Sequence, residues 1–262
     1  MDFATFLKET LTPMGLDWRR FQRRSIQRRV MARIQELHIA SFRKYASRVS
    51  ECPEEKARFR ALMSVTISRF FRDSDLFRTL RDQVLPECAD RHLPDARLLV
   101  WSAGCASGEE PYSLATLWRA YFHMVPIELK ILATDIDPHC LRRARLAEYG
   151  PSSLKEVSRE LVQTHFESRG QKFRIRPEIR QMVEFRAHDL ITSDIPGRFD
   201  LILCRNIAFT YFLPSWRAEI SRKLHSALEP DGFLVIGQNE SLPAGSENYF
   251  QPRGTYIYRR KG

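Results

Sequence analysis

The feature that most limits how this chain can fold is an alternation, from Arg97 onward, between short apolar runs and stretches with helical periodicity. The apolar runs are RLLVW, LKILATD, MVEFRAHD, FDLILC and DGFLVIG, and the helical stretches include PYSLATLWRAYFHM, PHCLRRARLAEY and SWRAEISRKLHSAL. Strands that alternate with helices predict an α/β fold with a doubly wound, mostly parallel sheet. Ligands of such sheets bind at the carboxyl ends of the strands.

Two segments do not follow this alternation. The stretch FESRGQKFRIRPEIRQ, at about 166–182, has a turn at Arg169-Gly170 and predicts a small β-hairpin insert. The first 64 residues show no strand pattern, and we expect helices at Asp17–Leu37, at Ser41–Val49 and up to about Leu62. The predicted domains are therefore an N-terminal helical unit, 1–64, and an α/β domain, 65–262.

The longest predicted helix, Asp17–Leu37, is amphipathic and basic. Its apolar face carries Ile26, Val30, Ile34 and Leu37, and its opposite face carries Arg20, Arg24 and Arg28. The whole chain has a formal net charge of +10. This charge indicates an acidic partner, which is a nucleic acid, an anionic membrane surface or an acidic protein.

The composition is that of an ordinary globular protein. The 262 residues, 43% of them hydrophobic, are enough to bury a sizeable core. No window approaches the roughly 18 consecutive apolar residues of a membrane span, and the N-terminus lacks the pattern of a signal peptide, so we expect a cytoplasmic protein without membrane insertion. Five cysteines that never form a CxxC pair argue against a disulfide framework and against a metal site.

The loop after the first predicted strand, Ala103 to Gly108, suggests the chemistry of the ligand. It lacks the G-x-G-x-x-G spacing of a dinucleotide loop and the Gly-Lys-Ser/Thr of a phosphate loop. A pyrophosphate would also meet the carboxylates of Glu109 and Glu110. S-adenosyl-L-methionine (SAM) suits these acids because its ammonium and sulfonium groups are cationic. Glu110 is interpreted as the binding residue and Glu109 as a helix cap.

Polar residues also follow the next three strands. Asp135 ends the second strand, where an acid can accept hydrogen bonds from both ribose hydroxyls, a feature that would serve NAD equally well. Asp189 follows the third strand and can accept from an adenine amine, and Asn206 follows the fourth. Because parallel strands end at one edge of the sheet, we expect these side chains to share a single site.

Several motifs together resemble one family. SRFFRD, WSAGCASGEEPYSLA, ATDID and FDLILCRN followed by YF are similar to the chemotaxis receptor methyltransferases, the CheR family, which use SAM to methylate glutamate side chains of receptors. The resemblance implies a seven-stranded class I SAM methyltransferase sheet and S-adenosyl-L-homocysteine (SAH) as the product. By resemblance, cofactor-binding residues are Thr66, Ser68, Arg72, Gly104, Glu110 (SAM amino group), Asp135 (ribose), Asp189 and Leu190 (adenine), and Asn206 and Ile207 (remaining wall).

The resemblance also places Arg72 beside the transferable methyl group, and Tyr211 is expected to help close the site over it. These two are the candidate catalytic residues. A glutamate, with an ordinary pKa of about 4.3, is already a carboxylate at neutral pH, so its attack on the methyl group needs alignment and no general base. An arginine can supply that alignment by holding the carboxylate in a fork.

The basic helix suits an acidic helical substrate, a receptor cytoplasmic domain docked on Arg20, Arg24 and Arg28. The short SRGQKF turn predicts that no receptor-tail peptide is tethered. A nucleic-acid substrate is not expected, because the sequence has neither an Asp/Asn-Pro-Pro-Tyr motif nor a Pro-Cys nucleophile. Two alternatives remain: a diverged methyltransferase for another protein or small-molecule carboxylate, and a catalytically silent SAM-binding sensor or scaffold.

Overall fold

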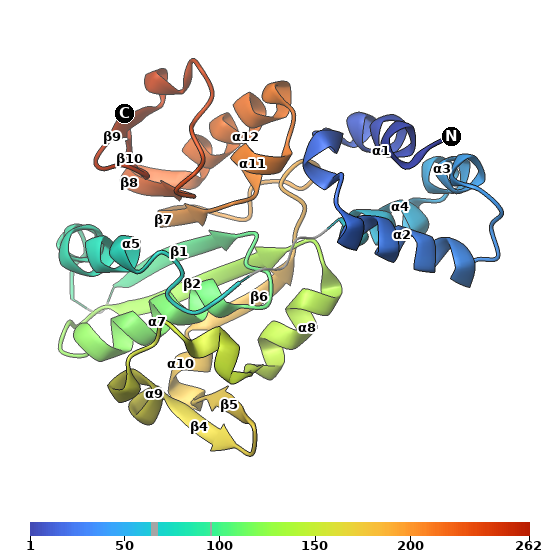
Figure 1. The fold of residues 1–262 in the computed structure, drawn as a ribbon. Helices are drawn as coiled ribbons and strands as arrows, with labels where there is room; N and C mark the ends of the chain where they lie inside the picture. The colour runs from blue at the N-terminus through green and yellow to red at the C-terminus, as the bar shows by residue number, and fades with distance from the viewer. Residues whose placement is uncertain (64–67, 95) are drawn as a thin grey trace.

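The computed structural model describes residues 1–63, 68–94 and 96–262. Its main sheet consists of β1 (Arg97–Ala103), β2 (Glu128–Asp135), β6 (Val183–Ala187), β7 (Phe199–Cys204), β8 (Leu228–Ile236), β9 (Phe250–Pro252) and β10 (Ile257–Arg260). The seven strands lie in the order β6-β2-β1-β7-β8-β10-β9 (Figure 1). The first five are parallel, and β10 is antiparallel to β8 and β9. The predicted doubly wound, mostly parallel sheet is confirmed.

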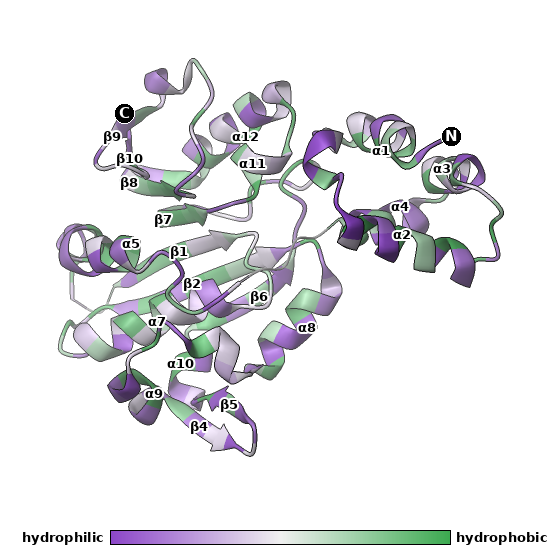
Figure 2. Ribbon diagram, viewed as in Figure 1, coloured by the Kyte–Doolittle hydropathy of each residue, from purple (hydrophilic) through white to green (hydrophobic). Residues whose placement is uncertain are grey.

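The central strands are apolar on both faces because helices cover both. On β7, Leu201 and Leu203 pack in a core that includes residues of α7 (Glu109–Tyr121). The alternate residues Ile202 and Cys204 pack in a second core, with residues of α12 (Pro214–Ala227) and of the N-terminal helices. Figure 2 shows the central strands largely in the hydrophobic colour. Buried parallel strands read as continuous apolar runs for this reason.

The N-terminal unit contains α1 (Phe3–Leu11), α2 (Arg24–Glu36), α3 (Phe42–Glu51) and α4 (Pro53–Leu62). Its centre is aromatic, with Phe6, Tyr45 and Phe59 in ring contact. Beside them the buried Glu55 accepts hydrogen bonds from Arg33 and from the hydroxyl of Tyr45. In the described part of the chain, no helix combines the length and apolar composition that crossing a bilayer requires.

The prediction of one continuous helix over Asp17–Leu37 is wrong. Trp18–Phe21 form a 3-10 turn, Arg23 is extended, and α2 begins only at Arg24. On a continuous helix Phe21 would point roughly 140° away from Ile26. The break instead buries the Phe21 ring against Tyr211, with 5.2 Å between ring centroids. Arg20 therefore does not lie on the helix that carries Arg24 and Arg28.

The insert is larger than the predicted hairpin. β4 (Phe166–Arg169) and β5 (Lys172–Ile175) pair as expected, but β3 (Glu148–Tyr149) adds a third strand, and the end of the predicted segment is a helical turn, α10 (Pro177–Arg180). The remaining helices are α5 (Ser74–Thr79), α6 (Leu85–Ala89), α8 (Pro138–Leu146), α9 (Arg159–His165) and α11 (Ala208–Tyr211). The predicted domain boundary, between 64 and 65, lies outside the described residues.

Candidate cofactor and active site

A cavity of about 1220 Å³, counted with its open mouth, lies at the carboxyl ends of the parallel strands. The N-terminal unit forms part of its wall through Leu16, Phe21, Arg60 and Met63. Predicted site residues that line the cavity are Ser68, Arg72, Gly104, Glu110, Asp135, Asp189, Leu190, Asn206, Ile207 and Tyr211. Thr66 lies outside the described residues. The tertiary structure thus brings together residues from five separate segments of the chain.

The loop between β1 and α7 needs glycine at two positions. Gly104 has φ +85°, and a side chain there would approach the Cδ1 atom of Ile207 to 2.8 Å. Gly108 has φ +91° and is closely surrounded by Tyr149, Ala144 and Phe185. Positive φ angles are accessible to glycine at little cost. The two glycines therefore allow the backbone to turn tightly beneath the cavity and α7 to begin at Glu109.

Glu110 is held by two neighbours at one end of the cavity. Its carboxylate accepts hydrogen bonds from Ser102 Oγ (2.7 Å) and from Arg205 Nη1 (3.0 Å). The Arg205 side chain, only 3% exposed, also donates to the Asp73 carboxylate. Two acids thus share one arginine, and this cluster keeps a net charge of −1 (two carboxylates and one guanidinium). Glu110 lines the cavity, so its carboxylate can pair with a cationic group of a ligand.

The segment that carries Arg72 is held in a strained conformation. Its two neighbours, Phe71 (φ +52°) and Asp73 (φ +67°), are both left-handed, which costs about 1–3 kcal/mol for each non-glycine residue. The Phe71 N–H donates to Ser113 Oγ (2.9 Å), and Arg205 Nη2 donates to the carbonyl oxygen of Arg72 (3.0 Å). These contacts fix the backbone from which the Arg72 side chain reaches the cavity.

Glu109 is the first residue of α7, directly after the N-cap residue Gly108. Its side chain is only 3% exposed, and its carboxylate accepts a hydrogen bond from its own backbone N–H at the start of the helix. Burial raises the pKa of this carboxyl, and a hydrogen bond with Ser68 acts in the opposite direction. Among the described residues Oε2 has no hydrogen-bond partner. Glu109 faces the packed interior, whereas Glu110 lines the cavity.

Asp135 lies at the end of β2 with both carboxylate oxygens already in use. Oδ2 accepts from the Ala106 N–H (2.8 Å) and Oδ1 from the Asp137 N–H (2.9 Å). The Ile136 N–H also donates to this carboxylate, which has about four acceptor positions, so a position remains for a ribose hydroxyl. Burial raises the pKa of this carboxyl, and the backbone hydrogen bonds only partly offset that effect.

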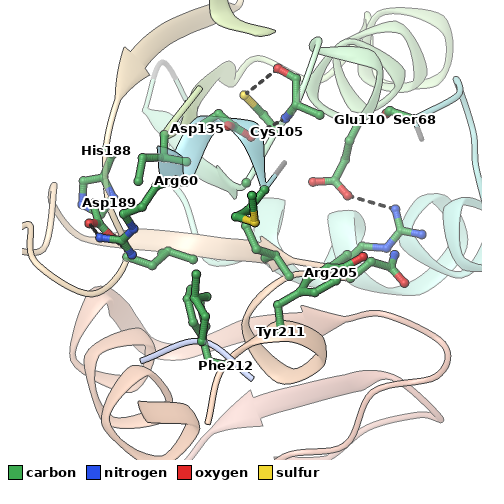
Figure 3. Close-up of a pocket in the computed structure, with 18 of the residues that line it drawn as sticks. Arg60, Ser68, Cys105, Glu110, Asp135, His188, Asp189, Arg205, Tyr211 and Phe212 are labelled. Atoms are coloured by element: carbon green, nitrogen blue, oxygen red, sulfur yellow. Dashed lines mark hydrogen bonds and ion pairs between the residues drawn. The ribbon is translucent and has the colours of Figure 1, made fainter. Parts of the chain in front are cut away.

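Asp189 differs from the expectation. Its carboxylate is paired with both terminal nitrogens of Arg60, which comes from α4, with 3.2 Å between Nη2 and Oδ1 (Figure 3). It also accepts from the Ile191 N–H (3.0 Å) and the Thr192 hydroxyl (2.9 Å). A carboxylate has about four acceptor positions, so this one is saturated. The expectation that it accepts from an adenine amine does not fit this geometry.

The loop after β7 is organised by Glu240, from the GQNESLP stretch. The Glu240 carboxylate accepts from the N–H groups of Asn206 (2.7 Å) and Gly237 (2.8 Å) and from the Thr210 hydroxyl (2.7 Å). Asn206 has φ +56°, a conformation that asparagine tolerates better than most residues. Tyr211 follows, with its carbonyl bonded to the Asp17 N–H (2.8 Å).

The residues of the site that sequence reasoning missed include three that hold its polar groups: Arg60, Arg205 and Glu240. Arg205 stands in the CRN triplet, whose position after an apolar strand was a usable signal. Arg60 and Glu240 are 129 and 34 residues away from the partners that they hold. No local pattern reveals such pairs.

The doubly wound sheet, with a cavity at its strand ends that Glu110 and Asp135 line, is the architecture of a SAM-dependent methyltransferase. Residues 66–258 match the family model described as CheR methyltransferase, SAM binding domain, and the chain belongs to this family. Its cofactor is SAM. The family and cofactor that the motifs predicted are confirmed.

Similar proteins support the assignment of the chain to this family. A chemotaxis protein methyltransferase of Listeria monocytogenes is 33% identical over 243 residues, 92% of this chain and 90% of that protein. A probable chemotaxis protein methyltransferase of Rhizobium etli is 33% identical over 271 residues, 100% of this chain and 97% of that protein. One of Salmonella typhimurium is 32% identical over 247 residues, 90% of this chain and 82% of that protein.

Proposed function

We propose that this protein transfers the methyl group of SAM to glutamate side chains of a chemotaxis-type receptor in the cytoplasm. The observation that carries the proposal is that Glu110 and Arg72 line one cavity. Glu110 belongs to a cluster with excess negative charge, which suits the cationic methionine end of SAM. Arg72 offers a cation to the carboxylate that accepts the methyl group.

The chemistry balances without a proton transfer. A glutamate carboxylate oxygen attacks the sulfonium methyl carbon, a C–O bond forms, and the C–S bond breaks. The electron pair of that bond returns to sulfur, and neutral SAH leaves. Because the acceptor is already ionised at neutral pH, the residues of the chain contribute alignment and charge, and positioning of this kind can contribute roughly 7–11 kcal/mol. In this proposal Tyr211, against Phe21, helps to close the cavity over the methyl group.

The receptor domain docks, in this proposal, on the exposed face of α2. Arg24 and Arg28 are four residues apart on that helix and both are exposed, so they present two adjacent cations to an acidic helix. Arg20 contributes from the preceding turn. A receptor-tail peptide is not tethered by the insert. Titration calorimetry with such a peptide is expected to give no measurable heat of binding, and a micromolar affinity would contradict this.

An Arg72→Ala variant tests the proposed function. Methyl transfer from labelled SAM is measured as base-labile methanol released from membrane and soluble fractions of the source cell. We expect label in a receptor band with the wild type, loss of that label with Arg72→Ala, and retained SAH binding in the variant. Arg78→Ala is the control, because Arg78 is exposed, pairs with Asp75 and lies outside the cavity.

Label confined to a soluble protein or a small molecule would keep the chemistry but reject the receptor as substrate. No label at all, together with tight SAH binding, would reject the enzyme and favour a sensor. Loss of SAH binding in Arg72→Ala would place Arg72 in cofactor binding alone.

A further inference from the structure

The Arg60–Asp189 pair joins two parts of the molecule at the cavity wall. Arg60 lies on α4 of the N-terminal unit, and Asp189 follows β6 of the main sheet. Both side chains are largely buried, with 12% and 15% of their surface exposed, and both line the cavity. A two-pronged arginine–carboxylate contact fixes orientation as well as distance. Figure 3 shows this pair on the opposite side of the cavity from Glu110 and Arg205.

The turn that Asp189 begins is tied to the cofactor wall at several points. The His188 N–H donates to the carbonyl of Asp135 (3.1 Å), so the ends of β6 and β2 are joined. Within the turn, the Ser193 N–H donates to the Asp189 carbonyl (2.9 Å). The Lys223 ammonium donates to the carbonyl of Ile191 (2.7 Å). The ion pair with Arg60 ties this turn to the N-terminal unit, and Leu190 and Ile191 belong to the same hydrophobic cluster as residues of that unit.

We propose that Arg60 is a positioning residue for the nucleoside half of SAM. The guanidinium of Arg60 orients the Asp189 carboxylate and with it the turn that Asp189 begins. Leu190, the next residue of this turn, forms part of the cavity wall. The inference rests on the proposed function, with the ribose of SAM at Asp135 and the adenine beside Leu190. Since Asp189 has no acceptor position left, it serves the adenine through the shape of this turn and not through its own carboxylate.

A consequence is that the N-terminal unit takes part in cofactor binding. Arg60 precedes residues 66–258, the segment that matches the SAM-binding domain. The segment 66–258 therefore contains Asp189 but not Arg60, so it lacks one member of the ion pair that shapes the wall of the cofactor site. The contact requires an acid at position 189, because a neutral amide there would not form a fully charged fork with arginine.

The decisive comparison uses two double variants that each neutralise a buried ion pair. Arg60→Met/Asp189→Asn removes the charges of the pair at the cavity. Arg33→Met/Glu55→Gln removes those of the buried pair inside the N-terminal unit, whose members do not line the cavity. Thermal melting of each variant establishes that it is folded. If the first double variant does not fold, Asp189→Asn alone and Arg60→Lys take its place.

The ligands separate the two halves of the cofactor. SAH has both halves, whereas 5′-methylthioadenosine has the nucleoside without the amino acid. We expect Arg60→Met/Asp189→Asn to weaken SAH by about tenfold or more in calorimetry, and methylthioadenosine by a similar factor in competition with SAH. Glu110→Gln should weaken SAH alone. The KM for SAM should rise in the Arg60 variant with little change in kcat, and the control pair should change neither ligand.

Equal affinity for SAH in the wild type and the Arg60 variant, within about twofold, would overturn the proposal. So would an equal loss in the Arg33 control, because the effect would then be a general loosening of the N-terminal unit. An effect on SAH without one on methylthioadenosine would also overturn it. Since these readouts need no methyl acceptor, a failure of the proposed glutamate substrate would leave them unaffected.

Discussion

At each of the two ends of the cavity, a buried arginine pairs with a carboxylate, but the two pairings differ. At the Glu110 end, Arg205 is shared by two acids, so a net negative charge remains. At the Asp189 end, Arg60 neutralises one acid whose acceptor positions are all occupied. A buried arginine positions carboxylates at both ends, but only at the Glu110 end is the arginine shared by two acids.

This difference follows the charge of the cofactor. The methionine part of SAM carries the ammonium and the sulfonium, and the adenosine part is uncharged. Near the adenosine, the charge of Asp189 is paired with Arg60, whereas Asp135 is held by backbone N–H groups and can accept from the ribose hydroxyls. The excess charge near the methionine part is instead paired when the cofactor binds. The comparison teaches that pairing, and not the mere presence of an acid, decides which carboxylate can bind a ligand.

The largest expected effect comes from breaking the charged end with Arg205→Met. Glu110 and Asp73 would lose their shared partner, and removing one member of a buried ion pair destabilises a protein by about 3–5 kcal/mol. We expect urea denaturation to show a loss of this size and methyl transfer to be abolished. Arg205→Lys should recover part of the stability only, because an ammonium cannot span Glu110, Asp73 and the Arg72 carbonyl. Full activity in Arg205→Met would refute the positioning role of Arg205.

A titration of SAH affinity against pH tests the contribution of Asp135 at the adenosine end of the cavity. The ionised Asp135 is the better acceptor for ribose hydroxyls, and its pKa is raised by burial. SAH affinity should therefore be constant above the folded-state pKa and fall as the pH is lowered through it, a fall that starts above the ordinary value of 3.8.

The same shift has the opposite sign for folding. Because the folded state favours the protonated Asp135, this group's contribution to stability is greatest at low pH and is lost as the pH rises. Because SAH affinity falls at low pH, the rise in Tm that SAH induces should become smaller on acidification. Glu109→Gln should leave that trend unchanged, because Glu109 does not line the cavity. Affinity that stays flat down to pH 4 would contradict the assignment of Asp135 to the ribose.

The smallest expected effect lies outside both ends, on α2. Exposed ion pairs contribute about 0.2–1 kcal/mol each, so Arg24→Glu/Arg28→Glu should raise the KM for the receptor domain several-fold without changing SAH affinity. Steady-state methylation at low and high salt measures this, and the difference should fade at high salt. Arg43→Glu, an exposed charge reversal on α3, is the matched control. A changed SAH affinity would mean that α2 affects the cofactor site.

Local patterns predicted most of the α/β domain because its strands and helices are defined by neighbouring residues. The apolar runs at β1, β2, β7 and β8 predicted these strands because both faces of the strands are buried. The glycines and acids of the loop before Glu110 indicated a ligand site. The break before α2 could not be predicted from local patterns. Phe21 leaves the helix and packs against the ring of Tyr211, which is far away in the sequence.

The sequence by itself determined the fold class, the family and the set of strand ends that meet at the site. Only the tertiary structure decided what each acid does there. Glu109, Glu110, Asp135 and Asp189 look alike in the sequence, but their surroundings differ. Glu109 is buried at the start of α7, and Glu110 pairs with an arginine that it shares with a second acid. Asp135 holds the loop that follows β1, and the acceptor positions of Asp189 are filled by Arg60 and by its own turn. Burial and partners set the properties of a carboxylate, and these depend on residues that are far away in the chain.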